Sequence, residues 1–382
     1  MSNLPTELLL AIFDWVEDKS TLFNLRLVSK NFNVVATPFA FRVLTVTEKM
    51  PSLEALVCLQ NCGRAIAEAV KELTFKGNGK EMDDQANELV LAFSGLPKFC
   101  NLGSLRLELY SFPGESASTT ENLFPFLFLQ MGLFSQLAVH PPPPLVSLTL
   151  DNLVPFDGHI YGEESFQHIF RTLKTLRISV LSRVYTNVES NRLLWASSIP
   201  HMLRSARECL ISLTLLSDQP VGVSPIAHVA DIHFPSLVSL TLRHFVLHPP
   251  SVGVADEHPD HDVLAFILRH GATLTHLALD QCAVYGGFAG TAVYPRPWHV
   301  VLKRMEAELP VLRSLDLTAD EHVGRVARPL GYLDLNAWDI YRRVGFEVGH
   351  EAEDAVALQS LMSVGESRRK GGVTTNLAHS NT

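Results

Sequence analysis

Two histidines and two aspartates fall together in the stretch EHPDHD (257–262), and imidazole and carboxylate groups are side chains that bind zinc. His258, Asp260, His261 and Asp262 are the candidate ligands. Proline interrupts the stretch, so no helix holds the imidazoles on one face as a metalloprotease motif does. A solvated loop in which Asp260 or Asp262 caps the next helix explains the cluster equally well. We therefore predict no metal ion and no cofactor, with a metal-dependent enzyme at 257–262 as a remote alternative.

No other sequence pattern predicts catalysis. The stretch GGFAG (286–290) follows an expected strand but lacks the Lys-Ser/Thr of a P-loop. The chain has no G-x-S-x-G nucleophile elbow, and no G-x-G-x-x-G follows a strand. Its five cysteines are an odd, scattered set, which does not indicate a disulfide framework. We expect a protein that is not an enzyme.

Charge and hydropathy limit the partners further. The formal net charge of −9 gives no global basic field, so no nucleic-acid partner is expected. No apolar stretch reaches the roughly 18 residues that span a bilayer, so no membrane partner is expected either. The N-terminal apolar run lacks a basic region before it and is flanked by acidic residues, unlike a signal peptide. We expect a cytoplasmic or nuclear protein.

A repeated pattern, L-x-x-L-x-L, organises most of the chain. Copies begin at residues 102, 145, 173, 210, 237, 274 and 312, with degenerate copies at 70 and 41. The fourth and sixth residues alternate as in a half-buried strand, and each interval has room for a strand, a helix and a loop. Helices are expected before three of the strands, at 163–173, 261–271 and 298–309.

These copies resemble the leucine-rich repeat, L-x-x-L-x-L-x-x-N/C-x-L. The nearest to the full pattern is LTHLALDQCAV (274–284), with Cys282 at the Asn/Cys position, and the spacing is longer and less regular than the usual ~20–29 residues. The resemblance implies an irregular solenoid with parallel strands inside and helices outside. The alternative is an ordinary α/β domain with leucine-rich strands.

The outward positions of these strands are candidates for recognition. Most hold serine or threonine, which suit a solvent-facing strand. Arginine is a common anchor in protein interfaces. The possible substrate-facing residues are therefore Arg106, Arg177 and Arg243, and the long loops are at least as good candidates.

The first 40 residues predict a small helical module. NLPTELLLAIFDWVED (3–18) gives an amphipathic helix with an unusually wide apolar arc. DKSTLFNLRLVSKNFNVVA (18–36) predicts a second helix that starts from an N-cap at Ser20. A module of this size scarcely builds a core of its own. Some of its apolar surface should therefore be covered by a partner or by the repeats.

These residues resemble the F-box, whose pattern runs L-P-x-E-l-l-x-x-I-f and then L-x-x-l-r-x-V-S-k-x-f. The matching residues are Leu4, Pro5, Glu7, Leu8, Leu9, Ile12, Phe13, Leu22, Leu25, Arg26, Val28, Ser29, Lys30 and Phe32. Val16 stands where leucine is commoner. The stretch TPFAFRVLTV (37–46) resembles the usual exit into the first repeat. The repeats behind it resemble the irregular leucine-rich arrays of fungal F-box proteins.

In that family the F-box docks on the Skp-type adaptor of an SCF ubiquitin ligase, and the repeats select a protein substrate. The resemblance implies a non-catalytic substrate receptor that reaches a cullin ligase through the adaptor. It also implies that the adaptor contacts come from Leu4, Pro5, Leu8, Ile12, Leu25 and Val28, although which of them pack inside the module stays open. The alternative is a scaffold or regulator that acts outside a ligase.

The expected architecture is α/β, with a small all-helical F-box module followed by an irregular leucine-rich-repeat-like solenoid. We place the module at 1–46, the solenoid at 47–335, a C-terminal capping segment at 336–367 and a disordered tail at 368–382. The capping segment is expected to be helical in DLNAWDIYRRVGFEVG (334–349) and EDAVALQSLMSVGESRR (353–369).

Overall fold

The computed structural model is mixed α/β, with most of its strands in one large sheet. The model describes residues 4–77, 82–109, 124–156, 158–182, 188–222, 225–247, 262–288, 297–318, 330–335, 341–343 and 349–377. The nine-stranded sheet is parallel in its recorded pairings, in the order β1-β2-β3-β4-β5-β6-β7-β8-β10. Among the residues described, no helix combines the length and hydrophobicity needed to cross a bilayer.

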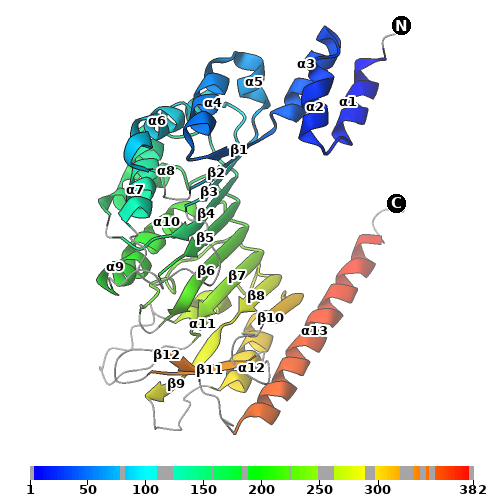
Figure 1. Cartoon of the computed structure of the whole chain (residues 1–382). Helices are drawn as coiled ribbons and strands as arrows, with labels where there is room; N and C mark the ends of the chain where they lie inside the picture. The colour runs from blue at the N-terminus through cyan, green and yellow to red at the C-terminus, as the bar shows by residue number, and fades with distance from the viewer. Residues whose placement is uncertain are drawn as a thin grey trace. The chain divides into compact units, whose positions relative to one another are not determined.

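The chain divides into two compact units, and the first comprises residues 1–154 and 162–173. Three helices open it, α1 (Thr6–Asp14), α2 (Lys19–Arg26) and α3 (Lys30–Ala40). The strands are β1 (Val43–Thr47), β2 (Glu72–Lys76), β3 (Ser104–Glu108) and β4 (Ser147–Leu153). The other helices are α4 (Met50–Asn61), α5 (Arg64–Ala69), α6 (Met82–Ser94), α7 (Phe124–Val139) and α8 (Glu164–His168), with a 3₁₀ turn at Leu96–Lys98. Figure 1 labels these elements.

The second unit comprises residues 155–161 and 174–382. Its strands in the large sheet are β5 (Thr175–Val180), β6 (Ser212–Val221), β7 (Ser239–Phe245), β8 (His276–Asp280) and β10 (Ser314–Thr318). A smaller sheet has the order β12-β11-β9, from β12 (Tyr341–Arg343), β11 (Gly331–Leu335) and β9 (Ala283–Phe288). The helices are α9 (Val188–Leu193), a π-helical turn (Leu194–Ser198), α10 (Ile199–Ala206), α11 (Val263–Leu268), α12 (Trp298–Glu308) and α13 (Glu351–Leu377). A 3₁₀ turn at His159–Gly162 lies at the unit boundary.

All nine L-x-x-L-x-L copies form strands of the large sheet. Each strand begins at the third residue of its copy, including the degenerate copies at 70 and 41. The pairing aligns equivalent residues, so Ser104 lies opposite Ser147, and Ser212 opposite Ser239. The fourth and sixth residues are buried in most copies, as Leu105 and Leu107 are in β3, and half-buried at Leu44, Leu315 and Leu317 in the first and last strands. The alternation predicted from the sequence is therefore the alternation that builds the core.

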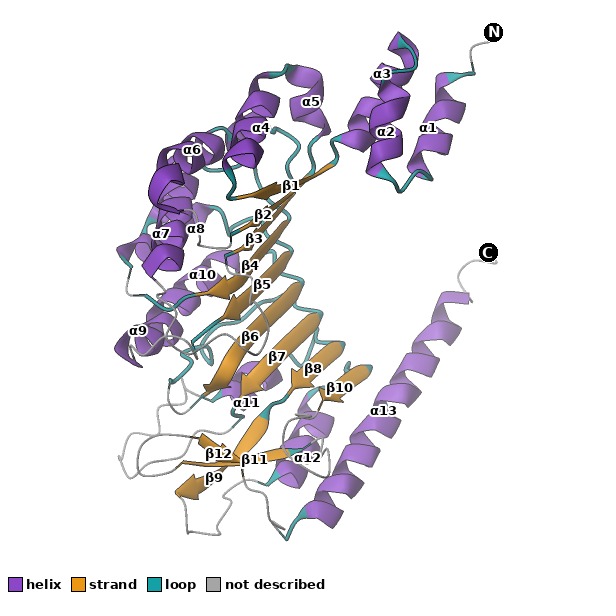
Figure 2. Ribbon diagram, in the orientation of Figure 1, coloured by secondary structure: helices purple, strands orange, loops and turns teal. Residues whose placement is uncertain are grey.

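Helices cover one face of the sheet in each unit (Figure 2). In the first unit, Phe75 of β2 packs edge-to-face on Phe93 of α6, with ring centroids 5.3 Å apart. In the second unit, Phe266 of α11 packs on Phe234 at 6.2 Å. The buried leucines of the strands and these aromatic side chains form the core between sheet and helices.

Three copies leave their strand through the same backbone conformation. Asn152, His244 and Gln281 occupy the eighth position of their copies, and their φ angles are 63°, 59° and 52°. A left-handed residue turns the chain so that the next side chain points back into the protein. That side chain is Leu153, Phe245 or Cys282, and all three are buried.

Some predicted elements differ from the structure. Helix α12 matches the expected helix at 298–309, but α8 and α11 are short because the chain turns at Ile169 and Arg269 toward the next strand. The segment 334–349, predicted as helical, instead contains the end of β11 and β12, which pair antiparallel. Helix α13 extends beyond residue 367 to Leu377, into the segment predicted as a disordered tail.

Candidate functional site

The three N-terminal helices bury one face of α1 in a small core. Leu9 and Phe13 are buried there with Leu22, Val35 and Ala36. The Phe13 ring contacts the rings of Phe32 and Phe39 edge-to-face, at 5.6 and 6.3 Å. Ala69 of α5, and the half-buried Leu44, Leu59 and Ile66, join the same cluster. The core therefore continues from the predicted module at 1–46 into the first strand and helices behind it.

Side-chain caps fix where α2 and α3 begin. The Asp18 carboxylate accepts the backbone N–H groups of Ser20 (3.2 Å) and Thr21 (2.8 Å), so Asp18 rather than Ser20 is the N-cap of α2. These hydrogen bonds, with those from the Ser20 and Thr21 hydroxyls, hold the pKa of Asp18 well below its usual range. Ser29 caps α3 by accepting from Phe32 N–H (3.2 Å). The segment predicted as one helix over 18–36 is therefore two helices with a break at Leu27 and Val28.

Polar contacts hold the helices to one another and to the sheet. The Arg26 Nε donates to Asn33 Oδ1 and Thr37 Oγ1, both at 3.1 Å, and its guanidinium lies 4.6 Å from the centroid of the Phe41 ring. Lys19 Nζ donates to the Val43 carbonyl oxygen of β1 at 2.7 Å. The apolar side chains that remain outside this framework are therefore presented by a folded module.

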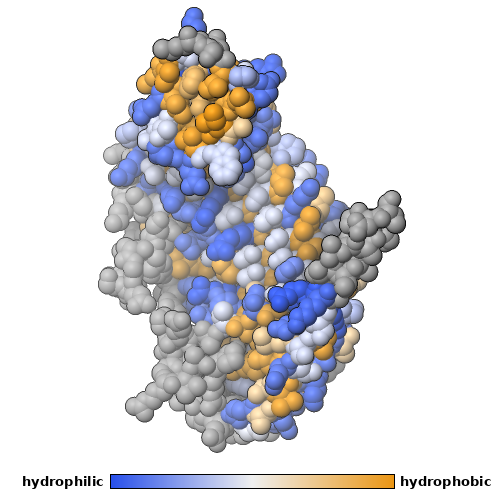
Figure 3. Space-filling model, turned by 90° about the vertical axis from the view of Figure 1, so that its right-hand side faces the viewer, coloured by the Kyte–Doolittle hydropathy of each residue, from blue (hydrophilic) through white to orange (hydrophobic). Residues whose placement is uncertain are grey.

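Many large apolar side chains of this module stay on the surface. Trp15 is 87% exposed and Leu27 is 84% exposed. The remaining exposed members are Leu4, Leu8, Leu10, Ile12, Phe23, Val28 and Val34. Figure 3 shows a hydrophobic patch over the helices at the upper end of the molecule. A monomeric domain rarely exposes so much contiguous apolar surface unless another molecule covers it.

The residues predicted to contact an adaptor separate into two groups. Leu4, Pro5, Leu8, Ile12 and Val28 are exposed, whereas Leu25 is half-buried against the module core. On α1, Leu8, Ile12 and Trp15 follow one another at i, i+4 and i+7, which places them on one side of the helix. Trp15 and Leu27 were not among the predicted contacts. The i+7 spacing from Leu8 was a sequence signal for Trp15. No such signal existed for Leu27, which is exposed because α2 ends there.

Acidic residues border the apolar residues of α1. Glu7 and Asp14 lie on the helix, Glu17 follows it, and all three are exposed. An apolar centre with a charged rim is the usual anatomy of a protein–protein interface. The arrangement therefore suits the docking of a protein.

The arginines predicted to face a substrate lie on strands of the large sheet, and two of them form ion pairs. Arg106 Nη2 lies 2.8 Å from both Glu108 Oε1 and Asp151 Oδ2. Arg243 Nε lies 3.2 Å from Asp280 Oδ2, whose carboxylate also accepts the hydroxyl of Thr318. Arg177 is half-buried on β5 and also has an interaction partner. The charges of Arg106 and Arg243 are thus balanced by carboxylates, among them Asp151 and Asp280 on the adjacent strands.

The histidine–aspartate cluster at 257–262 falls almost wholly outside the described residues. Asp262 is described, and its carboxylate accepts Leu264 N–H at 2.9 Å as the N-cap of α11. The helix-capping interpretation therefore holds for Asp262. His258, Asp260 and His261 lie outside the described residues.

Comparison with known proteins agrees with the N-terminal geometry. A family model described as F-box-like matches residues 1–43, so an F-box-like domain is present at this end of the chain. Curated proteins give no match to the chain. F-box domains generally bind Skp-type adaptors, and the match covers helices α1–α3, which carry the exposed apolar residues.

Proposed function

We propose that the chain is the substrate-recognition subunit of an SCF-type ubiquitin ligase. The exposed apolar side of the F-box-like domain docks on a Skp-type adaptor, which connects the chain to a cullin. The observation that carries this proposal is the division of α1, because Leu9 and Phe13 complete the core while Leu8, Ile12 and Trp15 stay exposed. The chain itself has no catalytic role in this proposal, and it acts in the cytoplasm or the nucleus.

The rest of the chain is, in this proposal, an irregular leucine-rich-repeat-like solenoid that binds a protein substrate. Support comes from the nine copies that pair in parallel and in register, and from the left-handed residue shared by three of them. Cys282, at the Asn/Cys position of the fullest copy, is buried and its Sγ donates to the Leu242 carbonyl oxygen at 3.4 Å. The thiol thereby bridges two successive copies.

Substrate recognition falls to the outward positions of the strands and to the adjoining loops. The ion pair of Arg106 with Asp151 joins neighbouring strands, as does that of Arg243 with Asp280, so these charges are held in fixed positions. Preorganised charges of both signs favour a polar protein surface over an apolar peptide. The identity of the substrate is a question for affinity capture with the proteasome blocked.

Co-purification with a recombinant Skp-type adaptor tests the docking step. Leu8→Asp with Ile12→Asp places two charges on the exposed side of α1 and should abolish co-purification while circular dichroism and the melting temperature stay unchanged. The matched control is Phe128→Asp with Met131→Asp, because both side chains are exposed apolar residues of α7. That control should retain the adaptor. Full binding by the α1 variant would show that the docking side is assigned wrongly.

The same co-purification, repeated with a cullin added to the adaptor, distinguishes a ligase subunit from a scaffold. A ligase subunit bound to the adaptor should also co-purify the cullin, and the α1 double variant should lose both proteins together. Adaptor binding without cullin would favour a scaffold or regulator that acts outside a ligase.

A further inference from the structure

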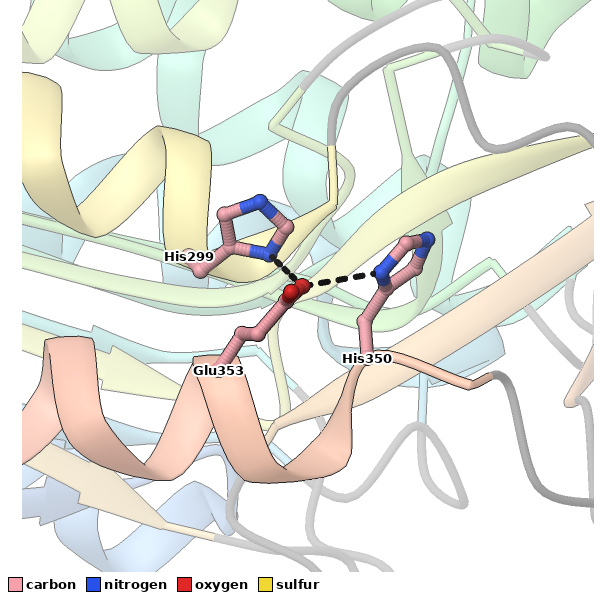
Figure 4. A group of neighbouring side chains, drawn as sticks. All are labelled: His299, His350 and Glu353. Atoms are coloured by element: carbon pink, nitrogen blue, oxygen red, sulfur yellow. Dashed lines mark hydrogen bonds and ion pairs between the residues drawn. The ribbon is translucent and has the colours of Figure 1, made fainter.

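Two histidines and a glutamate converge where α13 begins against α12. His299 is the second residue of α12, His350 immediately precedes α13, and Glu353 lies in the first turn of α13. The chain turns at Gly349, whose φ is 83°, and then enters the helix. Figure 4 shows both imidazoles directed at the Glu353 carboxylate. Two segments about 50 residues apart in the sequence thus bring three metal-binding side chains to one place.

The distances in this cluster suit a tetrahedral ion. Zinc binds imidazole nitrogen and carboxylate oxygen at about 2.0–2.2 Å, so two ligand atoms on one tetrahedral ion lie about 3.3–3.5 Å apart. Glu353 Oε2 lies 3.5 Å from His299 Nδ1 and 3.2 Å from His350 Nδ1. One ligand atom from each of the three residues lies within 4.8 Å of the others. Only a small movement of the imidazoles would bring all three atoms to one ion.

The buried Asp354 positions His299. Its Oδ1 accepts the backbone N–H of His299 at 2.7 Å and lies 3.2 Å from the Nδ1 of the same residue. Its Oδ2 accepts the hydroxyl of Tyr332 at 2.6 Å, and that hydroxyl accepts Trp298 N–H at 3.0 Å. Asp354 Oδ1 therefore faces the same ring nitrogen of His299 that faces Glu353, and Asp354 also holds the backbone from which that ring projects. The start of α12 is therefore fixed with the His299 ring facing Glu353.

The local charge also favours a divalent cation. Glu353 and Asp354 are adjacent carboxylates, and within the described part of the chain their ion-pair partners are His299 and His350, with no lysine or arginine. An ion of charge +2 would neutralise both carboxylates, and imidazole ligands select transition metals over magnesium or calcium.

We propose that His299, His350 and Glu353 bind a divalent transition-metal ion of the zinc class, which fastens the start of α13 to α12. His350 is half-exposed and Glu353 is exposed, so a water molecule can occupy the fourth position. The ion would take the place between the two imidazole Nδ1 atoms and the Glu353 carboxylate. This proposal is independent of the proposed ligase function, because it concerns the C-terminal helix and not the F-box-like domain.

Isothermal titration of the chelator-treated, full-length chain with zinc chloride tests the site. One equivalent should bind, and His350→Ala and Glu353→Gln should each weaken binding at least tenfold. Both side chains lie at the surface, so these variants should fold. His201→Ala is the matched control, because His201 is an exposed histidine on α10 of the same unit, and it should bind zinc as the wild type does.

The cluster at 257–262 is the competing zinc site, and a variant distinguishes the two. His258→Ala with His261→Ala should retain the bound equivalent. Loss of zinc in that variant, or unchanged binding in His350→Ala, would overturn the proposal.

Cobalt and hydrogen exchange give independent readouts. Cobalt bound by the wild type should show the strong visible absorption of a tetrahedral ion, and His350→Ala should not. Zinc should also slow amide exchange in the first turn of α13 in the wild type alone. Equal slowing in His350→Ala would contradict the proposal.

Discussion

Leu8 and Leu9 are neighbours in the sequence and lie on different faces of α1, about 100° apart around its axis. Leu9 is 2% exposed inside the core of the N-terminal helices, whereas Leu8 is 52% exposed at the surface. One turn later the pattern repeats, with Ile12 exposed and Phe13 buried. The same short helix therefore holds its module together with one face and leaves large apolar side chains exposed on another.

This division predicts opposite effects on stability for two similar substitutions. Leu9→Ala removes buried methyl groups and leaves a cavity, so the free energy of unfolding should fall by about 2–5 kcal/mol. Leu8→Ala should change it by no more than about 0.5 kcal/mol. Urea unfolding of both variants measures the difference. Equal losses would show that Leu8 also belongs to the core.

A buried histidine in the second unit predicts a pH dependence of stability. His270 Nδ1 donates to the Phe266 carbonyl oxygen at 2.8 Å, and its Nε2 accepts Phe234 N–H at 3.0 Å. Burial lowers the pKa of His270 from 6.5 to about 4. Between these values the unfolded chain binds more protons than the folded chain, so stability should fall as the pH is lowered from about 6.5 to 4, by up to about 3 kcal/mol.

Urea unfolding at pH 7.5 and 4.5 measures this contribution. His270→Phe should be less stable at pH 7.5, yet it should lose less stability on acidification than the wild type does. His201→Ala, at an exposed histidine, should keep the wild-type dependence. The same dependence in His270→Phe and the wild type would assign it to other groups.

The cysteines should differ sharply in reactivity. Burial raises the pKa of the Cys282 thiol to about 12, so almost no thiolate forms at pH 8. Cys58, Cys62, Cys100 and Cys209 are exposed. Alkylation of the native protein at pH 8, followed by peptide mass spectrometry, should modify these four quickly and Cys282 only after denaturation. Rapid modification of Cys282 would reveal that β8 opens readily.

The left-handed residues predict which substitutions the strand ends tolerate. At Gln281, glycine removes the strain of φ 52° and should leave stability unchanged or raise it by up to about 1 kcal/mol. Valine at the same position should lower stability by about 1–2 kcal/mol. Ala278→Val in β8 serves as the control, because a strand accommodates a β-branched residue. Thermal unfolding ranks the stabilities of the three variants. A Gln281→Val variant as stable as the wild type would contradict the prediction.

The strands were predictable because their signal is local and repeated. Alternating leucines mark the buried face, so even the degenerate copy at 41 located β1. The first residue of α2 could not be predicted, because Asp18 and Ser20 are both good N-caps. Only the folded geometry shows that Asp18 accepts the N–H groups. The break between α2 and α3 at Leu27 could not be predicted either, because apolar residues continue at helical spacing through it.

The interactions between distant segments could not be read from the sequence. Arg106 was predicted as a possible substrate-facing residue, and its ion pair with Asp151 follows only from the register in which the strands pair. His299 and Glu353 meet only because α13 packs on α12. The F-box-like domain could be recognised from its own residues. Which of its apolar side chains stay exposed could not, because that depends on which face of α1 packs in the core.

Helix α13 also lies near β10, the last strand of the large sheet. Within the described part of the chain, strand β10 has a strand neighbour on one side only, and α13 packs near it. Leu361 and Met362 of α13 line one groove together with Ser314 and Leu315 of β10. Arg368 donates to the carbonyl oxygen of Leu309, just before that strand begins. An open strand edge is a template on which other chains can add and aggregate. The C-terminal helix packs near this edge of the sheet and should hinder the addition of a strand from another chain there.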